Sequence, residues 1–236
     1  MQLAIDTSND YAGLALAREG KVIAEITWKA GQNHTTGLLP ALLDLLRLAQ
    51  VGPDSLSSIS VALGPGSYNG LRAGLSTAKG LAFALDIPLV GIGTLEIEAY
   101  PHYPSTLPIC PVHNAGREEI AAALYQWQDG KGQELEAPHL TTIPALIRKT
   151  DKATIFCGEL TDDIVSQIKA SLGHLAVIYP PVVTPRRVGF LTLLAWQRLS
   201  EDRSDDPATL QPLYLRGPAI TTPKARPYLK GMQNAQ

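Results

Sequence analysis

The chain has 236 residues, 20 Lys and Arg against 22 Asp and Glu, a net charge of −2 and 18% charged residues, where about 25% is usual for a soluble domain. Its 45% apolar content excludes a disordered chain. The near-neutral net charge argues against a protein whose main function is to bind nucleic acid through its own basic surface. No apolar run reaches the roughly 18 residues of a membrane span, no secretion signal is expected, and two cysteines fit a reducing compartment, so we expect a cytoplasmic α/β protein without membrane contact.

The first hundred residues alternate between strand and helix patterns. Alternating apolar residues predict three consecutive strands within residues 1–28, joined by a polar turn at 6–10 and a Gly-containing turn at 18–21. A helix, a strand, a helix and a strand are predicted next, at residues 38–49, 58–63, 70–85 and 88–92. This order predicts a partly parallel sheet with right-handed crossovers.

A proline cluster at residues 101–108 predicts a domain junction, after which the opening pattern recurs. Three strands at 109–112, 120–127 and 134–140 repeat the first three, so that Asn114 matches Asp6 at a spacing of about 108 residues. This self-similarity predicts two related halves. Two short strands and a helix follow at 154–157, 176–179 and 188–199.

We therefore expect two half-domains and a tail. The first half covers residues 1–100 and the second 101–216, with room for the last helix, about 188–199, to pack back on the first half. The Pro-rich residues 217–236 lack acidic side chains and are expected to be extended or disordered.

Two polar loops are candidate phosphate sites. In the loop at 64–72, glycines let backbone N–H groups approach an anion ahead of a helix N-terminus. It matches neither a P-loop nor GxGxxG, and a tight turn with Ser67 or Asn69 as helix N-cap stays open as the alternative. Asp6, Thr7 and Ser8 can hold hydrated Mg²⁺ and phosphate oxygens, with an Asx turn as the alternative.

Catalytic constellations are absent from the sequence. None of the five histidines lies three to five residues from another, so a zinc or iron site is not expected. No GxSxG nucleophile elbow occurs.

The two long helices have more apolar surface than one sheet face requires. Nine of the 13 residues from 38 to 50 are Leu or Ala, and the others form one narrow stripe. The second helix contains Gly74 and Gly80, and each interior glycine costs about 1 kcal/mol relative to alanine, which indicates a closely approaching neighbour. These features predict a subunit interface, the alternative being that both helices are central in a large monomer.

These residues carry a resemblance to a known family. LAIDTS at the N-terminus, a His before a Leu-Leu-Pro helix, GPGSYNGLRAG at residues 64–74 and PLYLR at 212–216 resemble the bacterial TsaB family, also called YeaZ. The resemblance covers residues 1 to about 216. It implies the actin/Hsp70-like (ASKHA) ATPase fold, built from two duplicated halves.

The resemblance also implies a function. It makes this chain a non-catalytic partner in the transfer of threonylcarbamoyl to N6 of the adenosine beside the anticodon, position 37, of tRNA. The implied partners are a metal-binding TsaD-like transferase and a TsaE-like P-loop ATPase, with tRNA contacted indirectly and a homodimer through the same surface when the chain is alone. ATP and metal are expected on the partner subunits, and this chain is expected to hold no cofactor and no catalytic residue.

Family pairing through the two helices implies an interface formed by one set of residues: Leu38, Leu42, Leu45, Leu46, Leu71, Arg72, Leu75 and Lys79.

The turn at 114–117 departs from the family's Asp-Ala-Arg/Gly-basic pattern, since it reads Asn-Ala-Gly-Arg. An uncharged Asn114 leaves any two-Asp phosphate clamp incomplete. The cofactor candidates of the cleft are therefore expected to be vestigial: Asp6, Thr7, Gly64, Gly66 and Ser67. The alternative function is a small ASKHA-type kinase or ATPase that binds nucleotide with these residues.

Overall fold

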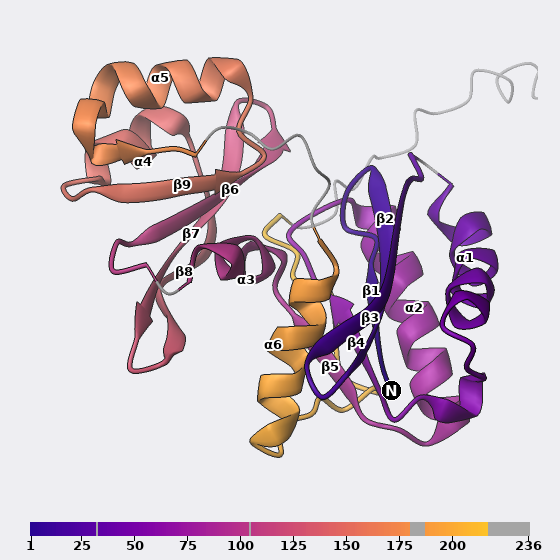
Figure 1. The fold of residues 1–236 in the computed structure, drawn as a ribbon. Helices are drawn as coiled ribbons and strands as arrows, with labels where there is room; N and C mark the ends of the chain where they lie inside the picture. The colour runs from indigo at the N-terminus through magenta and orange to yellow at the C-terminus, as the bar shows by residue number, and fades with distance from the viewer. Residues whose placement is uncertain (32, 104, 180–186, 217–236) are drawn as a thin grey trace, which may run out of the picture.

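The computed structural model describes residues 1–31, 33–103, 105–179 and 187–216, so the tail predicted at 217–236 lies outside the described residues. The described chain forms two α/β halves, each built on one five-stranded sheet with helices against its faces (Figure 1). None of the helices in these ranges combines the length and the apolar character that crossing a bilayer requires.

The first sheet has the strand order β3-β2-β1-β4-β5. β1 pairs antiparallel with β2 and parallel with β4. The strands are β1 (Gln2–Asp6), β2 (Tyr11–Arg18), β3 (Lys21–Lys29), β4 (Ser58–Ala62) and β5 (Leu89–Ile92).

Three helices cover the two faces of this sheet: α1 (His34–Leu48), α2 (Tyr68–Leu85) and α6 (Gly189–Ser200). Because side chains alternate along a strand, Leu3 and Ile5 of β1 pack in the core beneath α1 and α2, whereas Ala4 packs in the core beneath α6. Helix α6 thus returns from the far end of the described chain to complete the first half (Figure 1).

The second sheet repeats the first. Its order is β10-β9-β6-β7-β8, and read from the other edge, β8-β7-β6-β9-β10, it matches β3-β2-β1-β4-β5 strand for strand. As β1 does in the first sheet, β6 pairs antiparallel with the next strand, β7, and parallel with β9. The strands are β6 (Ile109–Gly116), β7 (Glu119–Gln128), β8 (Lys131–Thr141), β9 (Thr154–Gly158) and β10 (Ala176–Val177). The duplication predicted from the sequence is confirmed at the level of topology.

Helices α4 (Ile143–Lys149) and α5 (Asp162–Leu172) cover one face of the second sheet, and α3 (Thr94–Ala99) covers the other. Helix α3 precedes the junction in sequence but packs on the second sheet, while α6 follows it and packs on the first. The two halves therefore exchange covering helices across the predicted boundary at residue 100.

Candidate functional site

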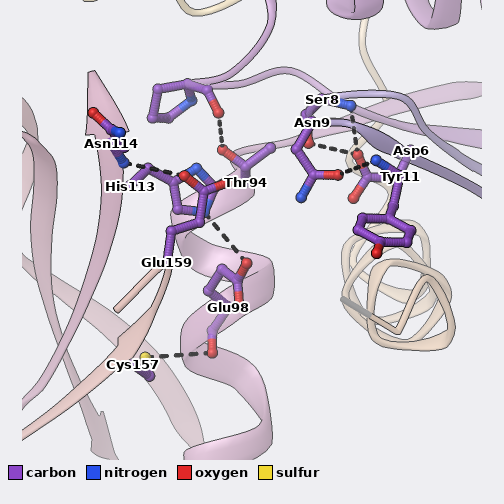
Figure 2. Close-up of polar contacts among 11 residues, drawn as sticks. Asp6, Ser8, Asn9, Tyr11, Thr94, Glu98, His113, Asn114, Cys157 and Glu159 are labelled. Carbon is purple, nitrogen blue, oxygen red and sulfur yellow. Dashed lines mark hydrogen bonds and ion pairs between the residues drawn. The ribbon is translucent and has the colours of Figure 1, made fainter. Parts of the chain in front are cut away.

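The turn after β1 is a closed Asx turn. The Asp6 carboxylate Oδ1 accepts hydrogen bonds from the Ser8 backbone N–H at 2.9 Å and from Ser8 Oγ at 2.6 Å (Figure 2). Asp6, Thr7 and Ser8 are all buried. The structure therefore contains the Asx turn that the sequence left open as the alternative, in which the Asp6 carboxylate accepts hydrogen bonds from its own turn.

The Gly-rich loop lies directly on this turn. Ser67 N donates to Ser8 O at 2.6 Å, and Thr7 Oγ1 donates to Gly70 O at 2.6 Å. A Cβ at Gly66 would overlap the Ser8 carbonyl oxygen, so glycine is required there by the contact between the two backbones. Ser67 Oγ accepts from Gly70 N at 3.3 Å and is the N-cap of α2.

The five cofactor candidates thus lie close together, but they contact one another and do not surround an open site. Asp6 and Thr7 lie beneath the loop that contains Gly64, Gly66 and Ser67. The backbone N–H of Ser67, which could hold a phosphate in an open loop, is used here to join the loop to the turn.

The matching turn of the second half has the same local bond. Asn114 Oδ1 accepts from Gly116 N at 2.8 Å, and Asn114 N donates to Glu159 Oε2 at 3.1 Å. Arg216 forms an ion pair with Glu119 and donates to Ala115 O, so this turn is also held by the chain's own groups.

A buried polar cluster joins the halves behind the two turns. His113 Nε2 lies 3.3 Å from Glu98 Oε1, and Cys157 Sγ donates to the Glu98 carbonyl at 3.6 Å (Figure 2). Thr94 Oγ1 donates to Pro65 O at 2.6 Å. This cluster was not predicted from the sequence, where its signal is a histidine directly after the apolar strand at 109–112. Within the described ranges, no group of three or more His, Cys, Asp or Glu side chains is arranged to hold a metal.

A cleft of about 320 Å³ remains between the halves. Its walls are the Gly-rich loop, the end of β6 and the segment 213–216, and they include Ser67, His113 and Tyr214.

The outer surface of α1 and α2 differs from the one predicted. Six of the predicted interface residues have at most 6% of their surface exposed and pack in the chain's own core: Leu38, Leu42, Leu45, Leu46, Leu71 and Leu75. The choice of these six side chains as an outer surface is therefore corrected, because all six are buried within the chain, five of them in the core against the first sheet. Arg72 is exposed and Lys79 is partly exposed.

Other apolar side chains of these helices do face outward. Leu39, Leu43 and Leu48 of α1 are 54%, 58% and 66% exposed, and Phe83 of α2 is 87% exposed. Gly80 lies one turn before Phe83, and a Cβ placed on it would meet nothing within 4 Å. We call Leu39, Leu43, Gly80 and Phe83 the docking face, because Leu48 lies on the opposite side of α1 from Leu39 at 3.6 residues per turn. The signal in the sequence for the leucines of α1 was the apolar positions that flank the narrow polar stripe of that helix.

An aromatic and guanidinium cluster lies at the start of α2. The Arg72 guanidinium stacks over the Tyr68 ring at 4.1 Å, and its Nε donates to the Tyr214 hydroxyl at 3.1 Å. The rings of Tyr68 and Tyr214 are 5.1 Å apart. The hydrogen bond from Arg72 to Tyr214 raises the pKa of the guanidinium.

Two α/β halves with one strand order, on either side of a cleft, are the arrangement of the ASKHA-fold proteins, to which actin and Hsp70 belong. A family model described as "TsaD: tRNA N6-adenosine threonylcarbamoyltransferase" matches residues 21–224. The "tRNA threonylcarbamoyladenosine biosynthesis protein TsaB" of Bacillus subtilis is 33% identical over 91% of this chain and 93% of its own length. The chain belongs to the TsaB family, within the wider group of TsaD-like sequences.

Two further similarities agree with this assignment. A solved structure of YeaZ from Pseudomonas aeruginosa superposes with a TM-score of 0.74 at 23% identity, over 91% of this chain and 99% of that chain, and so shares the fold. A tRNA N6-adenosine threonylcarbamoyltransferase of Nitratidesulfovibrio vulgaris is 37% identical over 40% of this chain, but over only 30% of its own length. The resemblance and the fold expected from the sequence are confirmed.

Proposed function

We propose that this chain is the non-catalytic partner subunit of the complex that transfers threonylcarbamoyl to N6 of adenosine 37 in tRNA. The observation that carries the proposal is the exposed docking face on α1 and α2, in a protein whose cleft turns are occupied by its own side chains and backbone. The face offers a binding surface, and the occupied turns leave the chemistry to another subunit.

The partner is a TsaD-like transferase, which supplies the metal and the reacting groups. A TsaE-like P-loop ATPase completes the complex, and tRNA contacts this subunit only indirectly. When the chain is alone, a second copy occupies the same docking face. The local hydrogen bonds of Asp6 and Asn114 support the absence of nucleotide from this chain, since each Asx turn already uses one backbone N–H, that of Ser8 or Gly116, that a phosphate could otherwise accept from.

The docking face has the chemistry of a helix-pairing surface. Burial of an exposed Leu or Phe side chain stabilises a contact by about 1.5–3 kcal/mol, and Phe83 is almost fully available for this. Gly80 costs the isolated helix about 1 kcal/mol relative to alanine and is not required by any neighbour in the described chain. A partner helix that approaches closely at Gly80 explains both features.

The first experiment mixes the chain with its cognate transferase and follows co-elution in size-exclusion chromatography. We expect a heterodimer with the wild-type chain, and loss of at least tenfold in affinity for Leu43→Asp and for Phe83→Asp. Leu135→Asp is the matched control, because Leu135 is 48% exposed on β8 in the other half. The proposal fails if no complex forms, or if both Asp variants bind as the wild type does.

A second experiment separates this function from that of a small kinase or ATPase. Titration of the isolated chain with ATP and Mg²⁺ in a calorimeter is expected to give no binding heat. Magnesium-dependent ATP binding that disappears in Asp6→Asn would instead support the alternative function, a small kinase or ATPase. Reconstitution of the tRNA modification is expected to require both this chain and the transferase.

A further inference from the structure

The segment 213–216 runs from the first half to the second across the mouth of the cleft. Its start is fixed to the first half, because Leu213 N donates to Leu63 O at 2.7 Å. Gly64 lies under this crossing with a φ of +103°, and a Cβ there would come within 3.1 Å of Leu213 O. The positive φ favours glycine at position 64, and the backbone at Leu213 leaves little room for a side chain there. We call residues 213–216 the strap.

The middle of the strap is attached to α2. Tyr214 accepts a hydrogen bond from Arg72 and packs against Tyr68, while Arg72 stacks on the same Tyr68 ring. Arg72 is exposed at the start of the helix that carries Gly80 and Phe83. A molecule that binds on α2 and takes the Arg72 Nε–H thus competes directly with Tyr214 for it.

The end of the strap is attached to the second half. Arg216 pairs with Glu119 at the start of β7 and donates to Ala115 O at 3.4 Å in the turn before it. Arg117 and Glu118 of that turn have φ of +56° and +62°, a conformation that costs non-glycine residues energy and needs support from its surroundings. The strap supplies two of the contacts that hold this turn.

We infer that the strap couples the outer surface of α2 to the β6–β7 turn of the second half. Loss of the Arg72–Tyr214 contact frees the middle of the strap, weakens the Arg216 contacts and loosens the turn on the far side of the cleft. An acidic side chain is the group that best competes with a tyrosine hydroxyl for a guanidinium. The coupling within the chain is independent of the proposed function, whereas its use by a docking partner rests on it.

The test measures hydrogen exchange by mass spectrometry on peptides that cover residues 113–119 of the full chain. Arg72→Gln is expected to accelerate exchange there about two- to fivefold, the effect of losing an exposed cation–π contact. Tyr214→Phe keeps the ring and removes the hydroxyl, and it is expected to accelerate exchange at residues 113–119 as well. Arg216→Gln removes the direct contacts and shows that the turn responds.

Lys79→Gln is the matched control on α2, since it also removes a positive charge but lies outside the Arg72 cluster. The coupling is overturned if Arg72→Gln leaves the turn unchanged, if Arg216→Gln does not loosen it, or if Lys79→Gln loosens it equally.

A second arm adds the transferase to the wild-type chain. Faster exchange at 113–119 in the complex is the expected result. A complex that forms without this change overturns the use of the strap in docking. Failure to form a complex instead counts against the proposed function, and the variants of the isolated chain still decide the coupling.

Discussion

Gly74 and Gly80 lie on one helix in opposite surroundings. A Cβ at Gly74 would overlap Thr7 Oγ1, whereas a Cβ at Gly80 would point into open space. Gly74 is therefore explained by packing within the chain, and Gly80 is not. The sequence marked both glycines as signs of a close neighbour, and the structure locates that neighbour inside the chain for the first of them.

Alanine at the two positions is expected to change stability in opposite directions. Gly74→Ala should lower the free energy of unfolding by about 1–3 kcal/mol, because it overpacks the contact with Thr7. Gly80→Ala should raise it by up to about 1 kcal/mol through helix propensity. Urea unfolding of both variants measures the difference, and equal effects would contradict the assignment.

The two cysteines are buried thiols. Burial raises the pKa of Cys110 to about 12 and the pKa of Cys157 well above 9.0. The folded protein therefore keeps both thiols protonated at pH values where the unfolded chain loses the protons. By linkage, the free energy of unfolding is expected to fall as the pH rises above 9.0.

Thiol labelling checks the state of these cysteines. At pH 8 a disulfide reagent such as DTNB should modify neither thiol in the folded chain and both in guanidinium chloride, because the thiolate is the reactive form. Rapid labelling of one thiol in the native protein would show that its site opens.

At the scale of the elements, α1 carries two apolar surfaces of different purpose. Leu42 is 5% exposed and packs in the first core, and the next residue, Leu43, is 58% exposed. The inner surface stabilises the chain, and the outer one is exposed and available for the partner that we propose.

Aspartate at these neighbouring positions is expected to separate the two roles. Leu42→Asp should cost several kcal/mol, because it buries an unpaired charge, and should unfold the chain. Leu43→Asp should change stability by less than about 1 kcal/mol. Circular dichroism melting distinguishes them, and a folded Leu42→Asp variant would refute the orientation of α1.

Periodicity predicted most elements but not their orientation. Every predicted strand and helix is present, with ends shifted by up to four residues. Helices α3 and α4 were missed because six and seven residues are too few to establish a period. Helix α5 was missed although Thr161 caps it, accepting from Ile164 N at 3.3 Å.

The candidate site was predicted in part. The cleft residues do meet, because the strand-end loops of parallel strands gather at one edge of the sheet. The direct contact between the Gly-rich loop and the turn after β1 could not be predicted, since it depends on Gly66 meeting Ser8, which is distant in sequence. The sequences of α1 and α2 are apolar around most of each helix and do not reveal which leucines face the sheet. Buried leucines were therefore predicted as interface residues.

At the scale of the molecule, the halves are interlocked by helix exchange. Val188, Leu191 and Leu194 lie buried against Ala4 and Val90 of the first sheet. The first half is therefore completed only by a segment that lies after the whole second sheet in sequence.

A fragment that ends at residue 103 is expected to lack a stable first half. It retains all five strands but leaves the α6 side of the sheet exposed. Dye binding to apolar surface and size-exclusion chromatography should show an aggregating chain, and co-expression of residues 187–216 should restore a soluble complex. A monomeric, cooperatively melting fragment would contradict this dependence.

The exchange of α6 also orders events at the ribosome. Strand β5 ends at Ile92 and α6 begins at Gly189, so at about 5–20 residues per second the nascent chain waits roughly 5–20 seconds between the two. Throughout that interval α1 and α2 can already cover one side of the first sheet, while its opposite side is bare. The apolar residues of that bare side, Ala4 and Val90 among them, stay in contact with solvent until α6 is synthesised.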